Sequence, residues 1–154
     1  LGEVVQDNQG SADAKELDLV LRIPAKVPRV SGDRERLAGV VNNLLGNAIK
    51  YTSQGGRVEV KCAVSDDRVE VSVADTGMGI AESDRDKVFD KFYRVDNAEV
   101  AKIPGTGLGL AIAKETVRAH NGSLNLESAP GQGTTFTMTL PALALDSAAC
   151  DTQV

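Results

Sequence analysis

Apolar residues recur along the chain with two different periods, and the changes of period predict the order of its strands and helices. Leucines alternate with mostly polar residues over 17–23, which predicts a strand that ends at Pro24. Over 33–51 the spacing becomes helical, and Asp33 is a suitable N-cap. The apolar residues of this second segment stand one, three or four positions apart: Leu37, Val40, Val41, Leu44, Leu45, Ala48 and Ile49. We therefore expect an amphipathic helix from Asp33 to Tyr51.

Strict alternation returns after Gly55-Gly56. Valine-rich alternation over 58–64 and 69–73, on either side of Asp66-Asp67, predicts a β-hairpin with one buried face. Cys62 falls on the apolar side of the first of these strands.

The second half of the chain predicts one more long helix and two closing strands. The helix is expected over about 108–120 and ends at Asn121-Gly122, a favourable left-handed cap. Alternating residues over 124–126 and 134–140 predict strands around the Pro130-Gly131 turn. The predicted fold class is α+β, with one mixed, mainly antiparallel sheet that carries its helices on one face.

The ends of the chain set the expected domain boundaries. We interpret residues 1–12 as the end of an inter-domain helix or linker, with a break over 7–11. Residues 13–141 are expected to form one domain, and the Ala-rich, polar tail 142–154 is expected to be disordered.

Composition narrows the function classes. A formal charge of -5 and a pI near 4.9 argue against nucleic-acid binding, which usually needs a basic face. No apolar run approaches the roughly 18 residues of a membrane span, so we expect no membrane contact by this domain. Because the chain begins at Leu1, we expect a piece of a longer protein that could itself be membrane-anchored. We expect the isolated piece to be monomeric and cytoplasmic. Cys62 and Cys150 are expected to be free thiols.

One row of polar side chains lies along the predicted helix 33–51. Asn43, Asn47 and Lys50 are four and three positions apart and cluster about 100° from the centre of the apolar stripe. Two carboxamides and an ammonium at the edge of a core suit a phosphate-bound Mg²⁺, because an amide oxygen can ligate this hard cation. The alternative is a solvated helix edge, and on this helix alone the alternative is favoured.

Asp75 continues the buried alternation of its strand, so its carboxylate needs a donor partner. Gly77 and Gly79 follow at once and permit a tight turn with close approach by a planar ligand, whose amino group could be that donor. The alternative is an aspartate that only caps the turn.

Two further segments lie between this strand and the second long helix. Gly105-Thr106-Gly107-Leu108-Gly109-Leu110 leads into a helix N-terminus and could hold phosphate, although it is neither a dinucleotide fingerprint nor a Walker A sequence. Phe89, Phe92 and Tyr93 cluster near a short predicted helix over 84–92 and suggest a latch for a lid. Residues 96–102 carry few apolar anchors, as in a loop that orders on ligand binding.

Taken in order, these features resemble the catalytic ATP-binding (HATPase) domain of two-component sensor histidine kinases, in the GHKL superfamily. Asn43 to Tyr51 is similar to the N box, Asp75 to Ile80 to the G1 box and Phe89 to Arg94 to the F box. Gly105 to Leu110 matches the G2 box, and Gly131 to Phe136 a final glycine box. The resemblance covers roughly residues 17–141 and implies a two-layer, Bergerat-type α/β sandwich with a flexible ATP lid.

The resemblance also implies a role for each matching residue. Asp75 would bind the adenine amino group with Thr134 beside it, and Asn47 would ligate Mg²⁺ with Asn43 next to it. Catalytic roles fall to Asn43, Lys50 and Arg94. The residues implied to bind ATP are Asn43, Asn47, Lys50, Tyr51, Asp75, Gly77, Gly79, Ile80, Lys102, Gly105, Thr106, Gly107, Leu108, Gly109, Leu110 and Thr134.

The phosphoacceptor is expected to lie elsewhere. His120, the one histidine of the chain, ends a predicted helix, where an imidazole usually has a structural role. We expect partners in a dimerisation domain that bears the acceptor histidine and in a downstream response regulator. Gyrase-like or MutL-like ATP hydrolases are an alternative, but they need a carboxylate where this chain has Asn43. A nucleotide-sensing pseudokinase is a second alternative.

Overall fold

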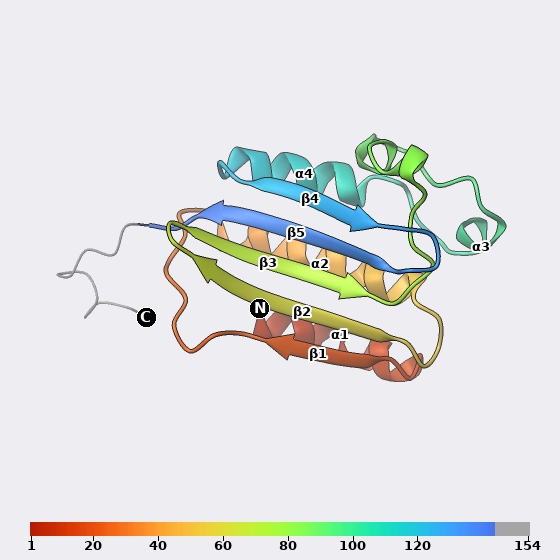
Figure 1. Cartoon of the computed structure of the whole chain (residues 1–154), viewed down its shortest axis with the longest axis horizontal. Coiled ribbons are helices and arrows are strands. Elements are labelled where there is room, and N and C mark those ends of the chain that lie inside the picture. Colours follow the sequence, from red (N-terminus) through yellow and green to blue (C-terminus); the bar gives the residue numbers. More distant parts are fainter. Residues whose placement is uncertain (144–154) are drawn as a thin grey trace.

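Five strands form a single sheet in the computed structural model of the protein, which describes residues 1–143. The strand order is β1-β2-β3-β5-β4, with β1 parallel to β2 and every other neighbouring pair antiparallel (Figure 1). The strands are β1 Asp18–Arg22, β2 Arg57–Ser65, β3 Arg68–Asp75, β4 Ser123–Ser128 and β5 Thr134–Pro141. The predicted mixed, mainly antiparallel sheet is confirmed.

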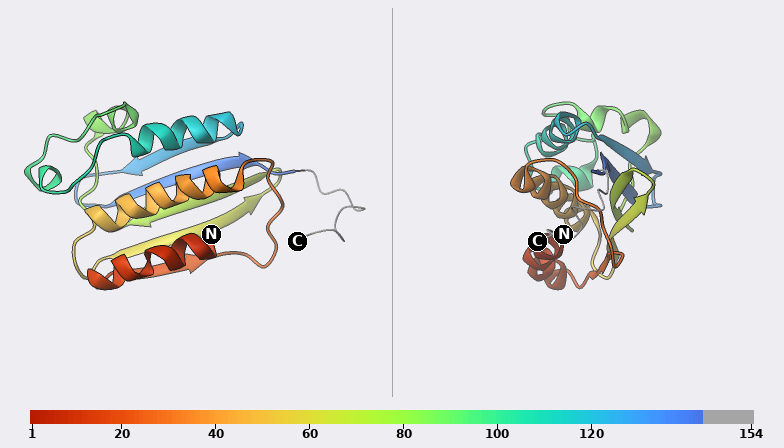
Figure 2. Two further views of the ribbon diagram at one scale, coloured as in Figure 1. Left: turned by 180° about the vertical axis from the view of Figure 1, so that it is seen from behind. Right: turned by 90° about the vertical axis from the view of Figure 1, so that its left-hand side faces the viewer.

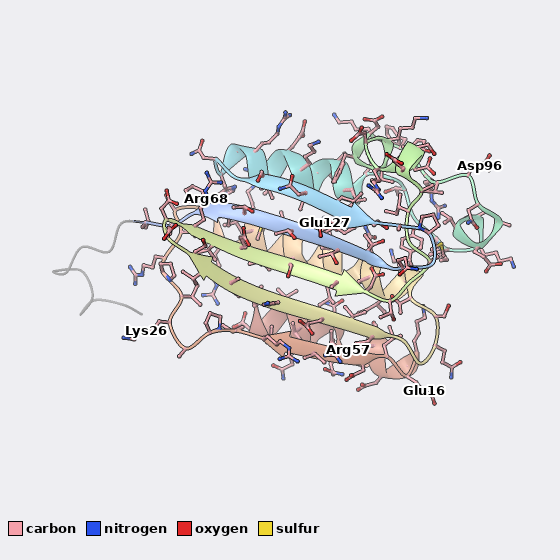
Figure 3. All side chains as sticks on the ribbon, viewed as in Figure 1. Glu16, Lys26, Arg57, Arg68, Asp96 and Glu127 are labelled. Carbon is pink, nitrogen blue, oxygen red and sulfur yellow. The ribbon has the colours of Figure 1, made fainter. Side chains whose placement is uncertain are left out.

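Three long helices cover one face of this sheet, and the core lies between the two layers (Figure 2). They are α1 Gly2–Ala14, α2 Arg34–Tyr51 and α4 Gly109–Ala119. On α2 the predicted cap is present, since the Asp33 carboxylate accepts from the backbone N–H of Arg36 at 3.1 Å. Leu44 and Leu45 of the same helix are fully buried against the sheet. The other face of the sheet carries polar side chains such as Glu127 (Figure 3).

The N-terminal segment differs from the expectation, because α1 continues through residues 7–11 without a break. Val5 and Ala12 are buried in the common core, and Asn8 binds both the Val4 carbonyl and Asn42 of α2. Packing on α2 therefore outweighs the turn signals of these polar residues. The strand that follows ends at Arg22, one residue before the exposed Ile23.

The remaining elements agree in outline with the sequence prediction. The second long helix ends at Ala119, one residue earlier than expected, and Asn121 has the left-handed conformation expected there, with a φ of +61°. Two short 3₁₀ turns, Glu82–Asp84 and Lys87–Phe89, replace the single short helix predicted over 84–92, and the short α3 spans Ala98–Ala101.

Two further expectations concern the thiols and the membrane. Cys62 is a buried free thiol whose pKa is raised by burial. Cys150 and the rest of the expected tail from 144 onward lie outside the described residues. Among the helices of residues 1–143, none has the length and apolar character needed to cross a membrane.

The connection from β3 to β5 positions the site. These two strands are hydrogen-bonded neighbours, yet the chain between them, residues 76–133, includes both 3₁₀ turns, α3, α4 and β4. Asp75 and Thr134 are register partners at the two ends of this connection, and Ser128 of β4 pairs with Thr134 in turn. Asp75, Thr134 and Ser128 therefore stand in one row across three strands.

Candidate functional site

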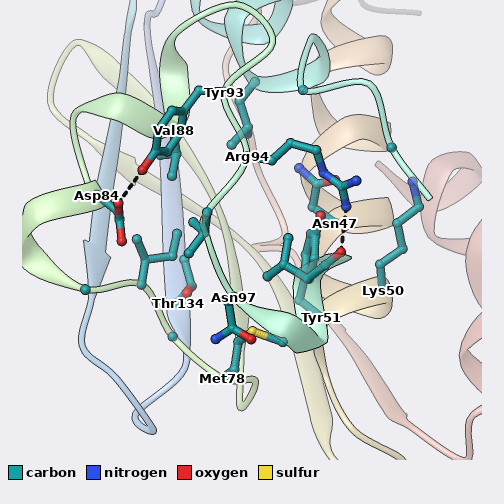
Figure 4. Close-up of a pocket in the computed structure, with 18 of the residues that line it drawn as sticks. Asn47, Lys50, Tyr51, Met78, Asp84, Val88, Tyr93, Arg94, Asn97 and Thr134 are labelled. Atoms are coloured by element: carbon teal, nitrogen blue, oxygen red, sulfur yellow. Dashed lines mark hydrogen bonds between the residues drawn. The ribbon is translucent and has the colours of Figure 1, made fainter. Parts of the chain in front are cut away.

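A cavity of about 370 Å³ opens between α2, the turn after β3 and the segment 93–107, which we call the lid (Figure 4). It brings together twelve of the residues predicted from the sequence: Asn47, Lys50, Tyr51, Asp75, Gly79, Ile80, Arg94, Gly105, Gly107, Gly109, Leu110 and Thr134. Thr134 and Lys50 lie on opposite sides of this cavity (Figure 4).

Five predicted residues do not line the cavity: Asn43, Gly77, Lys102, Thr106 and Leu108. Asn43 is nevertheless next to it, since its amide donates to the carbonyl of Gly109 at 3.5 Å, at the start of α4. Lys102 is 71% exposed and forms a surface ion pair with Glu99 at 3.4 Å.

Asp75 ends β3 with one carboxylate oxygen committed to the fold. Its Oδ1 accepts from the backbone N–H of Gly77 at 2.8 Å and from that of Thr134 at 3.2 Å. Within residues 1–143, Oδ2 accepts no hydrogen bond, and Asp75 lines the cavity. Burial raises the pKa of Asp75, and the two N–H donors oppose this increase only in part. The site therefore holds an acceptor that is free to bind a ligand amino group.

The glycine turns around Asp75 serve packing of the protein itself. Gly79 has a φ of +73°, and a Cβ there would come within 1.9 Å of the Ala129 carbonyl oxygen. Gly133 has a φ of +80°, and its Cβ would be 2.0 Å from the Asp75 carbonyl oxygen. Close approach of a ligand was the sequence-based reason for the glycine at 79, whereas the structure shows close approach of another backbone turn.

Side chains of α2 supply the polar groups on the other side of the cavity. Asn47 and Lys50 reach it from successive turns of the helix (Figure 4). Asn43 stands one turn earlier, beside the start of α4. No group of three or more His, Cys, Asp or Glu side chains within residues 1–143 could hold a metal. The protein oxygens that α2 offers a cation at this end are amide oxygens, which are hard donors of the kind that Mg²⁺ prefers, and ligand oxygens would complete its coordination.

The lid is held by hydrogen bonds that its backbone carbonyls accept. The Arg94 guanidinium donates to the carbonyl of Val100 at 2.8 Å and also to that of Ile103. Val100 itself is buried on the cavity. The Phe92 N–H, directly before the lid, donates to the carbonyl of Gly107, its last residue, at 2.9 Å and so closes the lid at its base.

The three residues of the predicted aromatic cluster divide among the core, the solvent-exposed surface and the cavity. Phe89 packs edge-on against Phe136 with 6.1 Å between ring centroids, whereas Phe92 is 70% exposed. The Tyr93 hydroxyl donates to Asp84, and both side chains line the cavity (Figure 4).

Sequence reasoning missed part of the lining, mainly from irregular segments: Ala48, Met78, Ala81, Asp84, Val88, Tyr93, Val95, Asp96, Asn97, Val100, Pro104, Pro130 and Phe136. Of these, Asn97 had a detectable signal, since it caps α3 by accepting from the Glu99 N–H at 2.7 Å. Ala48 and Phe136 lie on the apolar sides of a predicted helix and a predicted strand, so periodicity places them in the core and not at a site. Tyr93 is predicted only as a member of the aromatic cluster. The remaining residues belong to irregular segments without a periodic pattern.

A helix-covered mixed sheet, with a cavity between α2 and a glycine-bounded lid, defines the Bergerat class of ATP-binding domains. The chain belongs to the histidine kinase-, DNA gyrase B-, and HSP90-like ATPase family, whose model matches residues 32–144. This confirms the resemblance stated on the sequence boxes.

Known relatives narrow the family to sensor kinases. The chain is 43% identical to the sensor histidine kinase WalK of Bacillus subtilis over 127 residues, which is 81% of this chain and 21% of WalK. The mycobacterial sensor histidine kinase MprB has a similar structure, with a TM-score of 0.75 and 32% identity over 94% of this chain and 95% of that one. Full-length ShkA, solved in complex with AMPPNP, gives a TM-score of 0.81 and 32% identity over 94% of this chain and 30% of its own. The chain thus belongs to the catalytic ATP-binding domains of sensor histidine kinases. It spans about a fifth of the length of WalK.

Proposed function

We propose that the cavity binds Mg²⁺-ATP and that the domain transfers the γ-phosphate to a histidine on a separate dimerisation segment. The observation that carries this proposal is the two-sided polarity of the cavity. Asp75 and Thr134 supply acceptors at one side of the cavity. Asn47 and Lys50 supply an amide and an ammonium on the side opposite Thr134 (Figure 4). Adenine fits the first side and the phosphate chain fits the second.

On the adenine side, Asp75 Oδ2 accepts from the amino group at C6, and Thr134 lies next to it. Gly77, Gly79 and Ile80 form the turn that borders the base. Apolar contact comes from Met78 and Phe136, which also line the cavity.

On the phosphate side, cationic and amide groups bind the chain of oxygens. Lys50 and Tyr51 lie at the end of α2, and Gly105, Thr106, Gly107, Leu108, Gly109 and Leu110 lead into α4, whose first N–H groups have no intrahelical partner. Arg94 and Lys102 are the lid cations, and we propose that they contact the γ-phosphate after the lid rearranges.

The α2 row fits Mg²⁺. Asn47 presents an amide oxygen at the cavity, and Asn43 lies one turn away. When bound, Mg²⁺ supplies charge neutralisation on the phosphate oxygens. Asn47 holds the ion, while Lys50 orients the phosphate chain for in-line transfer.

The chemistry of the α2 row favours an imidazole as the acceptor. Asn43 stands where a water-activating carboxylate would be needed, and an amide cannot act as a general base. A neutral imidazole needs no such base, because it has its own lone pair.

That imidazole does not belong to His120. Its Nδ1 donates to the Thr116 carbonyl at 2.7 Å, and its Nε2 accepts from the Asp33 N–H at 3.0 Å. Both ring nitrogens therefore have partners that join α4 to the start of α2. We propose that the acceptor lies on the dimerisation domain of the full protein, that a response regulator acts downstream, and that the domain works in the cytoplasm.

The test is transfer in trans. The chain is mixed with the dimerisation helices of its parent and γ-labelled ATP, and label is expected on an acid-labile, base-stable phosphohistidine of those helices. Release of inorganic phosphate without labelled protein would instead support a hydrolase. Binding of ATP without either product would support a nucleotide sensor.

A further inference from the structure

Ser128 is the third member of the row that begins at Asp75, and its hydroxyl oxygen has three hydrogen-bonding partners. It accepts from the Ile80 N–H at 2.7 Å and donates to the Gly133 carbonyl at 2.9 Å. It also lies 2.8 Å from the hydroxyl oxygen of Thr134. One serine therefore joins the turn after β3, the turn before β5 and a residue of the cavity wall.

The single hydroxyl hydrogen of Ser128 decides the direction of the last contact. A carbonyl oxygen can only accept, so the contact with Gly133 requires the Ser128 hydrogen. Two lone pairs then remain on Ser128, one for the Ile80 N–H and one for Thr134. Thr134 must consequently donate its own hydrogen to Ser128. The opposite assignment would place two oxygen lone pairs 2.9 Å apart at Gly133 without a hydrogen between them.

With its hydrogen engaged, the Thr134 hydroxyl can only accept from the cavity. Asp75 Oδ2 is likewise only an acceptor when ionised. The wall that faces the base thus presents acceptors and no hydroxyl donor at these two positions.

Ser128 is itself held in place from both sides. Its backbone carbonyl accepts from the Arg85 guanidinium, and its register with Thr134 is fixed by the β4–β5 ladder. Thr134 is 7% exposed, so a change in the direction of its hydroxyl cannot be absorbed by bulk water.

We propose that Ser128 is a specificity-determining positioning residue. By accepting the hydrogen bond of the Thr134 hydroxyl, it makes this wall select a 6-aminopurine over a 6-oxopurine. The inference rests on the proposed function, because it places the base of ATP beside Asp75. Asp75 rejects a 6-oxo group in every variant, and Ser128 adds to that rejection by preventing Thr134 from turning its donor towards the oxo group.

The test compares ATP with inosine triphosphate, which carries an oxo group at C6 and a hydrogen at N1. Dissociation constants of both nucleotides are measured by calorimetry on the full chain and on Ser128→Ala. The Kd ratio of inosine triphosphate to ATP is expected to fall by about threefold to tenfold in Ser128→Ala, because the freed Thr134 hydroxyl can now donate. Ser128→Thr retains a hydroxyl and is expected to restore the ratio. Ser123→Ala, on the exposed face of the same strand, is the matched control and is expected to leave it unchanged.

A double-mutant cycle separates specificity from general loosening of the site. In a Thr134→Val background there is no hydroxyl to redirect, so Ser128→Ala is expected to leave the ratio unchanged there. Equal weakening of both nucleotides by Ser128→Ala in the native background would overturn the inference while leaving the ATP site intact. Failure of the unmodified chain to bind ATP would overturn the proposed function and this inference together.

Discussion

At the scale of single residues, Asp75 divides its two oxygens between the fold and the ligand. Oδ1 accepts two backbone N–H groups, and Oδ2 remains for the proposed adenine. An asparagine could keep both backbone bonds through its own Oδ1 but would point an NH₂ donor at the amino group of the base. This substitution should therefore lower the affinity for ATP without lowering the free energy of unfolding.

Asp75→Asn is expected to weaken ATP binding by at least about a hundredfold, since a charged acceptor is replaced by a donor. The stability of the nucleotide-free protein at neutral pH is expected to stay the same or rise. Because the folded pKa of Asp75 is raised, the stabilising protonated form is present at low pH and is lost as pH rises through that pKa. Calorimetry and urea titration measure the two effects, and near-normal affinity would contradict the adenine assignment.

The same pKa predicts a pH dependence of base binding. Adenine needs the ionised carboxylate, so affinity should fall as pH decreases through the raised pKa of Asp75, earlier than for an ordinary aspartate. Adenosine is the suitable ligand, because it has no phosphate that titrates in this range. A chemical-shift titration from about pH 8 to about pH 5 gives the profile, and a flat profile would count against Asp75.

Sequence patterns could predict Asp75 but not Ser128. The buried alternation of β3 continues to Asp75, so the direction of its side chain follows from local periodicity. The partners of Ser128 include Ile80, 48 residues away, and that contact depends on how two turns meet in space. The packing role of Gly79 was missed for the same reason.

At the scale of elements, the Arg94 side chain connects the start of the lid to α3 and to the residues that follow α3. Arg94→Ala removes the donors to the Val100 and Ile103 carbonyls and is expected to increase amide exchange over 98–104 in the nucleotide-free protein. Lys102→Ala is the matched control, because within residues 1–143 the side chain of that lysine forms an exposed ion pair with Glu99 and no other hydrogen bond. Equal exchange rates in both variants would show that Arg94 does not hold the lid.

Helix α2 predicts a metal dependence that can be assigned to one of its asparagines. Asn47→Ala is expected to remove most of the Mg²⁺ dependence of ATP affinity, because it deletes the cavity-lining amide that we propose as the Mg²⁺ ligand. Asn42→Ala is the control on the same helix, since Asn42 is exposed and binds Asn8 of α1. ATP affinity titrated against Mg²⁺ distinguishes them, and identical curves for Asn47→Ala and the native chain would exclude the ligand role.

The helices and strands that bury one continuous apolar face could be predicted from the sequence, and the segments without such a face could not. Helix α2, helix α4 and the β2–β3 hairpin each bury one face, so their periods appear in the sequence. Helix α1 buries little more than Val5 and Ala12 and carries break-like residues between them. The lid has no periodicity, and its shape depends on bonds such as those of Arg94.

At the scale of the whole molecule, residues 1–22 protect an edge of the sheet. β1 pairs with β2 over five residues, and α1 packs its buried side on α2. A chain that starts at residue 23 is expected to expose the β2 edge and to aggregate or unfold at lower urea concentration than the full chain. Size-exclusion chromatography and urea titration measure this, and addition of a 1–22 peptide is expected to reverse it. A monomeric, equally stable shortened chain would show that α1 and β1 are dispensable.

The long connection between the neighbouring strands β3 and β5 predicts that the backbone can be cut in the lid without loss of the fold. Asp75 and Thr134 pair directly in the sheet, so an intact lid backbone is not needed to hold the part of the chain before the lid against the part after it. A protease cut within 98–104 should leave two fragments that remain associated through β3–β5 pairing and the contact of α2 with α4. The same positions are suitable for new chain ends in a circular permutant, which is expected to fold with its backbone open at the lid.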